Sequence, residues 1–338
     1  MQNSTIYALT PGVSVPSRRF RWAQYVEVLH EKGFETNEST SVTGAYAPAS
    51  FLSRPFWLAS NLVENLYRTI RSNKADLRFL QRNLTATLCT WEPLLKRPFV
   101  FDVDDAIFLE KRGFNADTIS KASSLTICGN DFLANHFSKY GSVAVLPTAV
   151  DPDYFFPKNI ENSSEKLICW SGSSSGLKYL NAIEGSISIV LKKYPDVFLK
   201  VICDKAPEFK KIRHDRIIYE PWSKEREVAA LQECAVGLMP LEDDLWARGK
   251  CSFKMLTYMA VGIPVVVSPV GMNVEVLAHG PCGFAASNAE DWVDAISFLL
   301  EAETAAKQMG KVGRRIIETT YAKNIVGSQL AQKLAALL

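Results

Sequence analysis

Short apolar runs alternate with amphipathic stretches along the whole chain. The predicted strands cover 4–9, 99–103, 124–128, 143–146, 167–170, 197–202, 216–219, 236–239 and 264–267. Apolar residues spaced three or four apart predict helices at 18–31, 50–72, 177–193, 224–233 and 251–260, with further helical patterns from 289 onward. Repeated alternation of strands and helices predicts an α/β fold with parallel sheets.

A polar, proline-containing segment at 148–164 separates two series of strand and helix units. It predicts two doubly wound, Rossmann-like domains at 1–150 and 151–320. A last helical stretch at 321–338 is expected to pack back on the first domain. A length of 338 residues suits two such domains better than one core.

Composition narrows the class of protein. Hydrophobic residues make up 47% and charged residues 22%, so both halves can bury a core. A net charge of +2 gives no argument for a nucleic acid partner. The seven cysteines form no CxxC pair and the four histidines have no zinc-site spacing, so we expect free thiols, a reducing cytosol and no bound metal.

Membrane-crossing and export signals are missing from the pattern. The start of the chain lacks a basic region followed by a long apolar run, so we expect no cleavable signal. The most apolar stretch, 261–267, contains Pro264 and is much shorter than the ~20 residues that span a bilayer. These features predict a soluble, cytoplasmic protein that is at most peripheral to a membrane.

The segment 240–275 offers the first candidate chemistry. A predicted strand ends, a polar loop follows, and a helix is expected to open near Ser252. Free amides at a helix start can bind a diphosphate. Lys250 and Lys254 lie four residues apart, so one helix face would present both ammonium groups. The alternative interpretation is a solvated basic helix start.

The run LTYMAVGIPVV at 256–266, followed by SPVG at 268–271, resembles the donor-site signature of family 4 retaining glycosyltransferases (glycosyltransferase group 1). The segments VLPTAVD at 145–151 and GPCGF at 280–284 resemble two further motifs of that family, in the expected order. The resemblance implies the GT-B fold, in which two Rossmann-like domains face a cleft. It also implies a retaining transferase, with a nucleotide-sugar donor in the C-terminal domain and an acceptor in the N-terminal one.

The sequence departs from this family at one motif. Two glutamates separated by seven residues usually contact the donor, and by register they fall at Gly249 and Thr257, neither of which is acidic. We therefore assign the chain to a divergent subgroup that lacks the paired-glutamate motif. The missing acids leave open a non-catalytic nucleotide-sugar-binding subunit. A GT-B epimerase or phosphorylase is the other alternative.

Small residues open the second domain in the loop that follows Trp170. Glycine and serine let backbone amides approach a phosphate closely, although a flexible turn has the same composition. By resemblance, Lys178 takes the place of a family lysine six residues after Gly172, whereas Ser173 replaces an arginine. The candidate donor-binding residues are Gly12, Arg18, Ser171, Gly172, Ser173, Lys178, Trp222, Lys250, Cys251, Ser252, Lys254, Gly271, Asn273 and Glu275. The nucleotide sugar is a substrate, and no separate cofactor is expected.

Three carboxylates, Asp102, Asp104 and Asp105, lie at the end of an apolar strand. Ligands bind at strand carboxyl ends in open α/β sheets, so these residues are the candidate catalytic or sugar-contacting acids. A magnesium site and helix N-capping are the alternatives. We favour recognition of the acceptor or donor sugar, without a metal.

The segment 51–98 combines eight basic residues with three acids and several aromatic side chains. Such a segment can lie on an anionic membrane, with Arg68 and Arg71 among the contacting residues, or pack on the core with a solvated face. A membrane contact would suit a lipid-linked acceptor. A soluble glycan or small molecule is equally compatible with the sequence, which also leaves the oligomeric state open.

Overall fold

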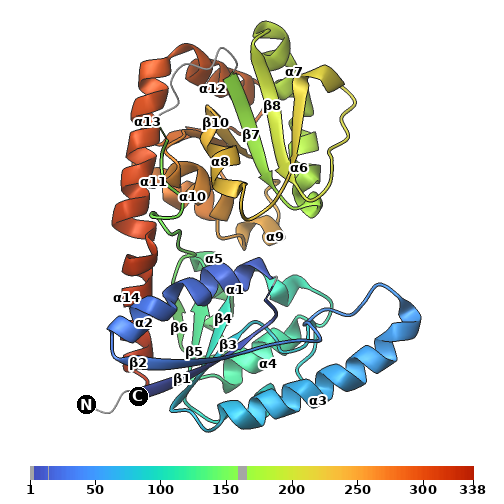
Figure 1. Ribbon diagram of the computed structural model, residues 1–338, viewed down its shortest axis with the longest axis vertical. Coiled ribbons are helices and arrows are strands. Elements are labelled where there is room, and N and C mark those ends of the chain that lie inside the picture. Colours follow the sequence, from blue (N-terminus) through green and yellow to red (C-terminus); the bar gives the residue numbers. More distant parts are fainter. Residues whose placement is uncertain (1–3, 14, 159–165) are drawn as a thin grey trace. The chain divides into compact units, whose positions relative to one another are not determined.

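The computed structural model describes residues 4–13, 15–158 and 166–338. The chain divides into two compact units. The N-terminal unit holds the chain up to Ala149 together with Arg248–Cys251 and Lys323–Leu338. The C-terminal unit holds Val150–Ala247 and Ser252–Ala322. In the described residues, each unit contains one sheet with helices packed against it (Figure 1).

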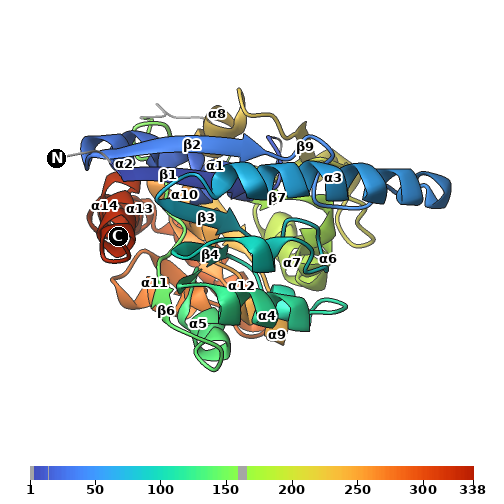
Figure 2. The ribbon, with the colours of Figure 1, turned by 90° about the horizontal axis from the view of Figure 1, so that it is seen from below.

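Over the described residues, the N-terminal unit contains one sheet of six parallel strands in the order β2-β1-β3-β4-β5-β6. The strands are β1 Ser4–Thr10, β2 Phe34–Thr40, β3 Leu77–Gln81, β4 Phe99–Val103, β5 Leu125–Cys128 and β6 Val143–Val145. The helices of this unit are α1 Pro16–Arg21, α2 Val26–Glu31, α3 Arg54–Ser72, α4 Phe114–Ala122, α5 Asp131–Phe137 and α14 Lys323–Ala335. Helices α1 and α2 lie on one face of the sheet, and α3 and α4 on the other (Figures 1 and 2).

The order of these strands creates a topological switch point between β1 and β3. The chain leaves β1 toward β2 on one side and returns to β3 on the other side. A crevice opens at the carboxyl ends of two strands where the connections diverge in this way, and ligands bind there in open α/β sheets. The sheet therefore marks the β1/β3 edge of this unit as a place for a site.

The single helix predicted at 18–31 is wrong, because the structure breaks it into α1 and α2. Trp22 leaves helical geometry with φ −134° and ψ −65°, and a 3-10 turn over Ala23–Tyr25 follows. The break turns Trp22 and Tyr25 into the core, where both are fully buried. Burying these two large rings against the sheet outweighs the few hydrogen bonds that a continuous helix would add.

Helix α14 comes from the far end of the chain and completes the N-terminal core. Val326, Leu330 and Leu334 are fully buried there in one cluster with Tyr25 and Leu29. The packing is close, because a Cβ on Gly327 would lie 3.1 Å from Val28 Cγ1. The N-terminal unit is therefore assembled from both ends of the sequence.

Helix α3 has the opposite polarity pattern to an ordinary surface helix, with polar side chains buried and apolar ones exposed. Its buried face is polar and includes Asn61, Asn65 and Arg68. Arg68 donates hydrogen bonds to the carbonyl oxygens of Thr10 (2.7 Å) and Ser39 (2.5 Å). The prediction that Arg68 faces a lipid surface is therefore wrong. Thr10 and Ser39 lie at the carboxyl ends of β1 and β2, so the buried guanidinium joins the ends of these two neighbouring strands.

The C-terminal unit repeats the doubly wound plan. Its described residues form one sheet of six parallel strands in the order β12-β11-β10-β7-β8-β9. The strands are β7 Lys166–Gly172, β8 Val197–Cys203, β9 Ile217–Pro221, β10 Val236–Met239, β11 Val265–Val267 and β12 Gly283–Ala285. This order is the Rossmann arrangement, with its switch point between β7 and β10.

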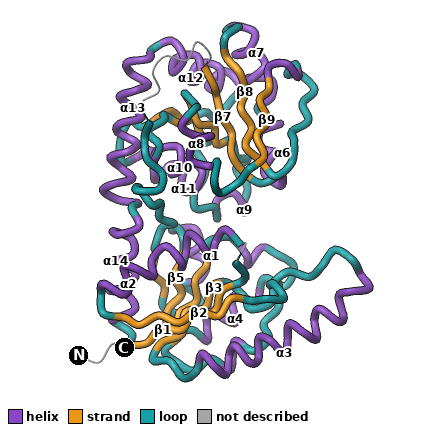
Figure 3. The backbone as a smooth tube through the Cα atoms, in the orientation of Figure 1, coloured by secondary structure: helices purple, strands orange, loops and turns teal. Residues whose placement is uncertain are grey.

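Helices cover both faces of this second sheet (Figure 3). They are α6 Leu177–Ala182, α7 Glu184–Lys193, α8 Glu227–Gln232, α10 Phe253–Ala260, α11 Met272–Ala278, α12 Ala289–Glu301 and α13 Glu303–Ile316, with α9 Leu245–Arg248 at the boundary of the units. A cluster of buried residues that includes Ile168, Val201 and Ile296 fills the space between the sheet and its helices. The prediction of two Rossmann-like α/β domains is confirmed. Nowhere in the described ranges is a helix both long and apolar enough to cross a membrane.

Candidate functional site

The first candidate site lies at the β7/β10 switch point of the C-terminal unit. The small-residue loop follows β7, and Lys254 comes from the first turn of α10, which follows β10. Lys254 Nζ lies 4.8 Å from the centroid of the Trp170 ring. A Cβ on Gly172 would come within 2.5 Å of Lys254 Cε and 2.8 Å of Nζ. Glycine at 172 therefore lets the lysine ammonium lie directly against the loop.

The side chain of Tyr258 anchors the start of this loop. Its buried hydroxyl accepts a hydrogen bond of 2.8 Å from the backbone amide of Ser171. The ring itself packs on β10 at Gly237, where a Cβ would lie 2.4 Å from Tyr258 Cγ. Tyr258 lies within the resembling motif, but no local pattern indicates that its hydroxyl reaches Ser171, 87 residues away.

Asp204, which follows β8, fixes the other side of the loop. Its carboxylate accepts hydrogen bonds from Ser174 N (2.5 Å) and Ser174 Oγ (2.9 Å). These two hydrogen bonds lower the pKa of Asp204 below its ordinary value. The loop is therefore held between neighbouring strands in one conformation, as a preorganised anion site requires.

Ser252 and Asn273, both predicted to contact the donor, are buried and bonded to each other. Ser252 Oγ donates to Asn273 Oδ1 (2.7 Å), and Asn273 Nδ2 donates to the carbonyl of Ser268 (2.9 Å). Ser252 adopts a left-handed φ of +49° just before α10. These side chains tie the starts of α10 and α11 to the end of β11, and they position the site without facing it.

The remaining donor candidates of this unit lie at the same carboxyl edge of the sheet. Trp222 follows β9 and is 48% exposed, whereas Gly271 follows β11 with φ +53° and opens α11. Glu275 is exposed in the first turn of that helix. Lys178 is exposed in α6, and its ammonium lies 4.5 Å from the centroid of the Tyr179 ring.

The structure corrects the placement of Lys250 and Cys251. Helix α10 begins at Phe253, so the prediction that Lys250 and Lys254 share a helix face is wrong. Residues 248–251 belong to the N-terminal unit, where Asn130 Nδ2 donates to the carbonyl of Lys250 (3.1 Å). The Cys251 thiol donates to the carbonyl of Asp104 (3.1 Å), and burial raises its pKa well above the ordinary range. These long-range bonds hold the segment out of the helix.

The acids at the end of β4 are engaged by two arginines. Asp102 is 1% exposed, and Arg21 binds both of its oxygens, at 2.5 and 3.2 Å. Arg82 pairs with Asp104 (2.6 Å) and Asp105 (2.7 Å). Burial pushes the pKa of Asp104 up, but the charge and hydrogen bond of Arg82 outweigh it, and the pKa is below its ordinary value. No group of three metal-ligating side chains occurs in the part of the chain that the structure describes.

Arg18 and Gly12, predicted to face a phosphate, make contacts within the N-terminal unit near the end of β1. Arg18 forms a bidentate ion pair with Glu38 of β2, with Nε 2.7 Å from Oε1 and Nη2 2.6 Å from Oε2. Gly12 is buried, and its carbonyl accepts the amide of Val15. The sequence did not indicate that Arg21 and Arg82 pair with these acids, because their partners are 81 and 22 residues away along the chain.

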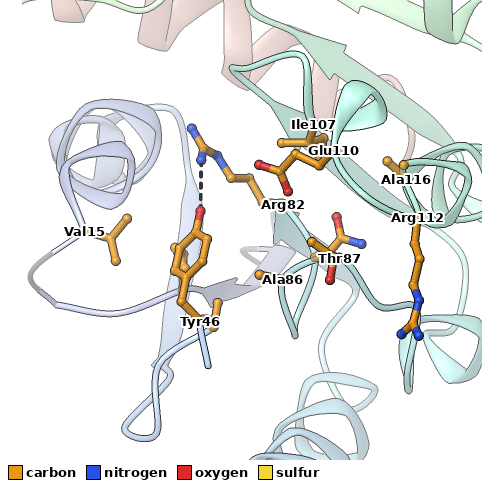
Figure 4. Close-up of a pocket in the computed structure, with 13 residues that line it drawn as sticks. Val15, Tyr46, Arg82, Ala86, Thr87, Ile107, Glu110, Arg112 and Ala116 are labelled. Atoms are coloured by element: carbon orange, nitrogen blue, oxygen red, sulfur yellow. Dashed lines mark hydrogen bonds between the residues drawn. The ribbon is translucent and has the colours of Figure 1, made fainter. Parts of the chain in front are cut away.

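A pocket opens at the β1/β3 switch point of the N-terminal unit. Its lining comes from the segments after β1, β2, β3 and β4, and includes Tyr46, Arg82, Asn83, Thr87, Glu110 and Arg112. Tyr46, Arg82 and Glu110 lie on one side, with the Tyr46 hydroxyl 3.5 Å from Arg82 Nη1, and Arg112 lies on the other (Figure 4). Desolvation raises the pKa of Glu110 above its ordinary value.

Strained backbone is concentrated around this pocket. Among the described residues, four non-glycine residues have a positive φ, and three of them, Arg82 (55°), Thr87 (62°) and Arg112 (65°), line the pocket. Such strain clusters at ligand sites, because the surrounding structure must enforce it. Asn115 Nδ2, for example, donates to the carbonyl of Thr87 (2.8 Å). The pocket is a second candidate site, which the sequence did not reveal.

Residues 166–302 match the family described as "Glycosyl transferases group 1". The C-terminal unit is a group 1 glycosyltransferase domain. The match begins at β7 and ends after α12, so it contains the small-residue loop, Lys254 and Tyr258. The prediction of a group 1 glycosyltransferase is thereby confirmed. No curated protein matches the chain.

Solved structures of similar fold cover nearly the whole chain. Sucrose-phosphate synthase from Thermosynechococcus elongatus superposes with a TM-score of 0.72 at 13% identity, over 99% of both chains. HepE from Anabaena in complex with UDP and glucose gives 0.70 at 12% identity, over 99% of this chain and 100% of that one. A glycosyltransferase from Rickettsia africae gives 0.66 at 14% identity, over 100% and 99%. The group 1 domain therefore belongs to a GT-B fold.

Proposed function

We propose that this glycosyltransferase transfers a sugar from a nucleoside-diphosphate donor to an acceptor hydroxyl, with retention of anomeric configuration. The observation that carries the proposal is the Lys254 ammonium lying against Gly172, at the switch point of the group 1 domain. HepE, which shares the fold, was solved with UDP and glucose, so UDP is the nucleotide to test first. Retention follows from the resemblance to the family 4 enzymes.

The C-terminal site suits a leaving diphosphate. Negative charge grows on the phosphate oxygens as the glycosidic bond breaks, and fixed cations and amides that face them lower the barrier. Lys254 supplies a cation, and the backbone at Gly172 and Ser173, just beyond the amide that Tyr258 holds, is proposed to supply amides at the end of β7. The exposed ring of Trp222 and the first turn of α11 are proposed to bind the base and ribose.

The N-terminal pocket is proposed to bind the acceptor. Tyr46, Asn83 and Glu110 present hydroxyl, amide and carboxylate groups beside the small apolar side chains of Ala86 and Ala116. This mixture suits a hydroxyl-rich ligand with an apolar face, such as a sugar. Asp104 and Asp105 are proposed to act through Arg82, which they orient toward the pocket. Asp102 is buried under Arg21 and is proposed as a positioning residue.

Calorimetric titration with UDP tests the donor site. We expect Lys254→Ala to weaken UDP binding by about 1.5–3 kcal/mol, the usual value of a charge-assisted bond. Lys192→Ala is the matched control, because Lys192 is an exposed lysine of the same unit on α7. Equal affinity of the two variants and the wild type would rule out Lys254 as a diphosphate ligand.

Turnover separates an enzyme from a non-catalytic nucleotide-sugar-binding subunit. We expect slow release of free sugar from UDP-sugars, and NMR of the first-formed product should show the donor's anomeric configuration. The reaction should proceed in EDTA, because Asp104 and Asp105 are already paired with Arg82 rather than left for a metal ion. Tight UDP binding without any turnover would favour the subunit.

A further inference from the structure

The outward face of α3 and of the turn before it is a row of large apolar side chains. Its members are Phe51, Leu52, Phe56, Val63, Tyr67 and Ile70, which are between 58% and 83% exposed. The helical members follow a spacing of three, four or seven residues and so lie on one face. We call these six residues the α3 apolar row. Contiguous exposed apolar residues of this kind indicate an interaction surface.

Polar bonds on the opposite face hold the helix in this orientation. Asn61 Nδ2 donates to Thr43 Oγ1 and to the carbonyl of Gly44, both at 2.9 Å. Asn65 and Arg68 reach the carbonyls of Leu84 and Thr10. Rotating α3 to bury its apolar row would break these hydrogen bonds and leave buried acceptors such as the carbonyl of Leu84 without this donor, which costs free energy. The outward apolar face is therefore built into the unit.

The exposed charged side chains of α3 itself are basic. Arg54, Arg71 and Lys74 are exposed at the two ends of α3. Lys96 is also exposed beside the C-terminal end, where its amide donates to Asn73 Oδ1 (2.8 Å). The single acid of α3, Glu64, accepts the amides of Val42 (2.6 Å) and Thr43 (2.9 Å). The apolar row is thus flanked by basic side chains, while the helix's own carboxylate is engaged elsewhere.

We propose that α3 lies flat on an anionic lipid surface, with the α3 apolar row in the boundary between headgroups and acyl chains. Arginine and lysine at its ends would contact lipid phosphates. The helix spans 19 residues, about 28 Å at 1.5 Å per residue, which gives a long, narrow contact. A second copy of the chain fits less well. A two-fold antiparallel pair would place Arg54 of one helix near Arg71 of the other, and the acid of α3, Glu64, is already engaged by the amides of Val42 and Thr43.

Vesicle flotation of the full-length protein tests the proposal. Vesicles of phosphatidylcholine mixed with phosphatidylglycerol should carry the wild-type protein upward, and vesicles of phosphatidylcholine alone should not. Replacing two members of the row, in Phe56→Gln/Val63→Gln, should reduce the partition coefficient roughly a hundredfold, since each side chain loses its transfer from water. Replacing two charges, in Arg71→Gln/Lys74→Gln, should reduce it about tenfold or more and weaken its salt dependence.

The matched control is Phe114→Gln/Ile189→Gln, which removes one exposed aromatic and one exposed aliphatic residue from other helices. It should float like the wild type. The proposal is overturned if the wild-type protein stays below anionic vesicles at low salt, or if the row variant floats as well as the control. It is also overturned if light scattering shows a dimer that only the row variant abolishes, because the row then binds a second copy.

The same protein samples separate this proposal from the proposed function. UDP titration and circular dichroism of the row variant should match the wild type, because α3 belongs to the N-terminal unit and its apolar row makes no core contact. Loss of flotation with UDP binding intact therefore reports on the lipid surface alone. Loss of UDP binding in the Lys254 variant, with flotation intact, reports on the donor site alone.

Discussion

Two residues without side chains set the geometry of the donor site. Gly172 leaves space for Lys254, and Gly237 leaves space for the ring of Tyr258. Tyr258 in turn accepts the amide of Ser171, at the point where β7 ends and the loop begins. Lysine, loop and strand are therefore fixed relative to one another by contacts within one unit. Such fixed positions would let the site bind a diphosphate without rearranging.

The Tyr258 hydroxyl gives a test at this scale. Tyr258→Phe should destabilise the protein by about 1 kcal/mol, because the Ser171 amide loses its acceptor. It should also weaken UDP binding severalfold, since the loop is no longer held. Urea unfolding and calorimetry measure the two effects. Tyr67→Phe, which removes an exposed hydroxyl from the other unit, should change neither. Wild-type affinity in Tyr258→Phe would show that the loop is positioned by other contacts.

At the scale of elements, α14 decides whether the N-terminal unit has a complete core. It packs against Tyr25 and Leu29 although nearly 300 residues separate it from them in sequence. The sequence showed only that the end of the chain is helical, and did not show which residues the helix packs against.

Strands β2 and β3 were not predicted from the hydrophobic pattern. Strand β2 (FETNEST) has little apolar character, and the buried β3 carries Arg78 and Gln81.

We expect Leu330→Ala to lower the unfolding free energy of the N-terminal unit by about 2–5 kcal/mol, as for other fully buried leucines. Leu338→Ala is the control, because that leucine is 51% exposed, and it should have little effect. Urea unfolding followed by tryptophan fluorescence measures both. An equal, small effect of the two variants would mean that α14 is dispensable for the core.

At the scale of the whole molecule, the reactivity of the cysteine thiols tests how well the interior of both units is buried. All seven are free, and six are buried. Desolvation raises the pKa of Cys128 to about 12 and that of the partly exposed Cys89 to about 11. The thiolate is the reactive form, so a raised pKa slows every thiol reaction at neutral pH.

Titration with a chromogenic disulfide should therefore count one slowly reacting thiol in the native protein and seven after denaturation. The native rate should rise about tenfold per pH unit between pH 7 and 10, because pH stays below the pKa of Cys89 and the thiolate fraction grows in proportion. Fast reaction of several thiols at pH 7 in the native protein would contradict the buried positions of the other six.

The sequence by itself determined the class of fold, the two-domain plan and the group 1 signature. The hydrophobic period predicts most of the strands and helices, and short motifs such as LTYMAVGIPVV carry the resemblance to the family. It also located Lys254 and the small-residue loop, because both lie at junctions of predicted elements. These properties depend on residues that are close together in the chain.

Only the tertiary structure decided which polar groups meet and which face of a helix is covered. Arg68 and Arg71 are indistinguishable in sequence, yet Arg68 is buried among strand-end carbonyls and Arg71 is exposed. Arg21 meets Asp102 because α1 packs beside the end of β4. Periodicity shows that a helix has two faces, but the partners that select one face come from distant strands. Their positions are set by the topology of the sheet.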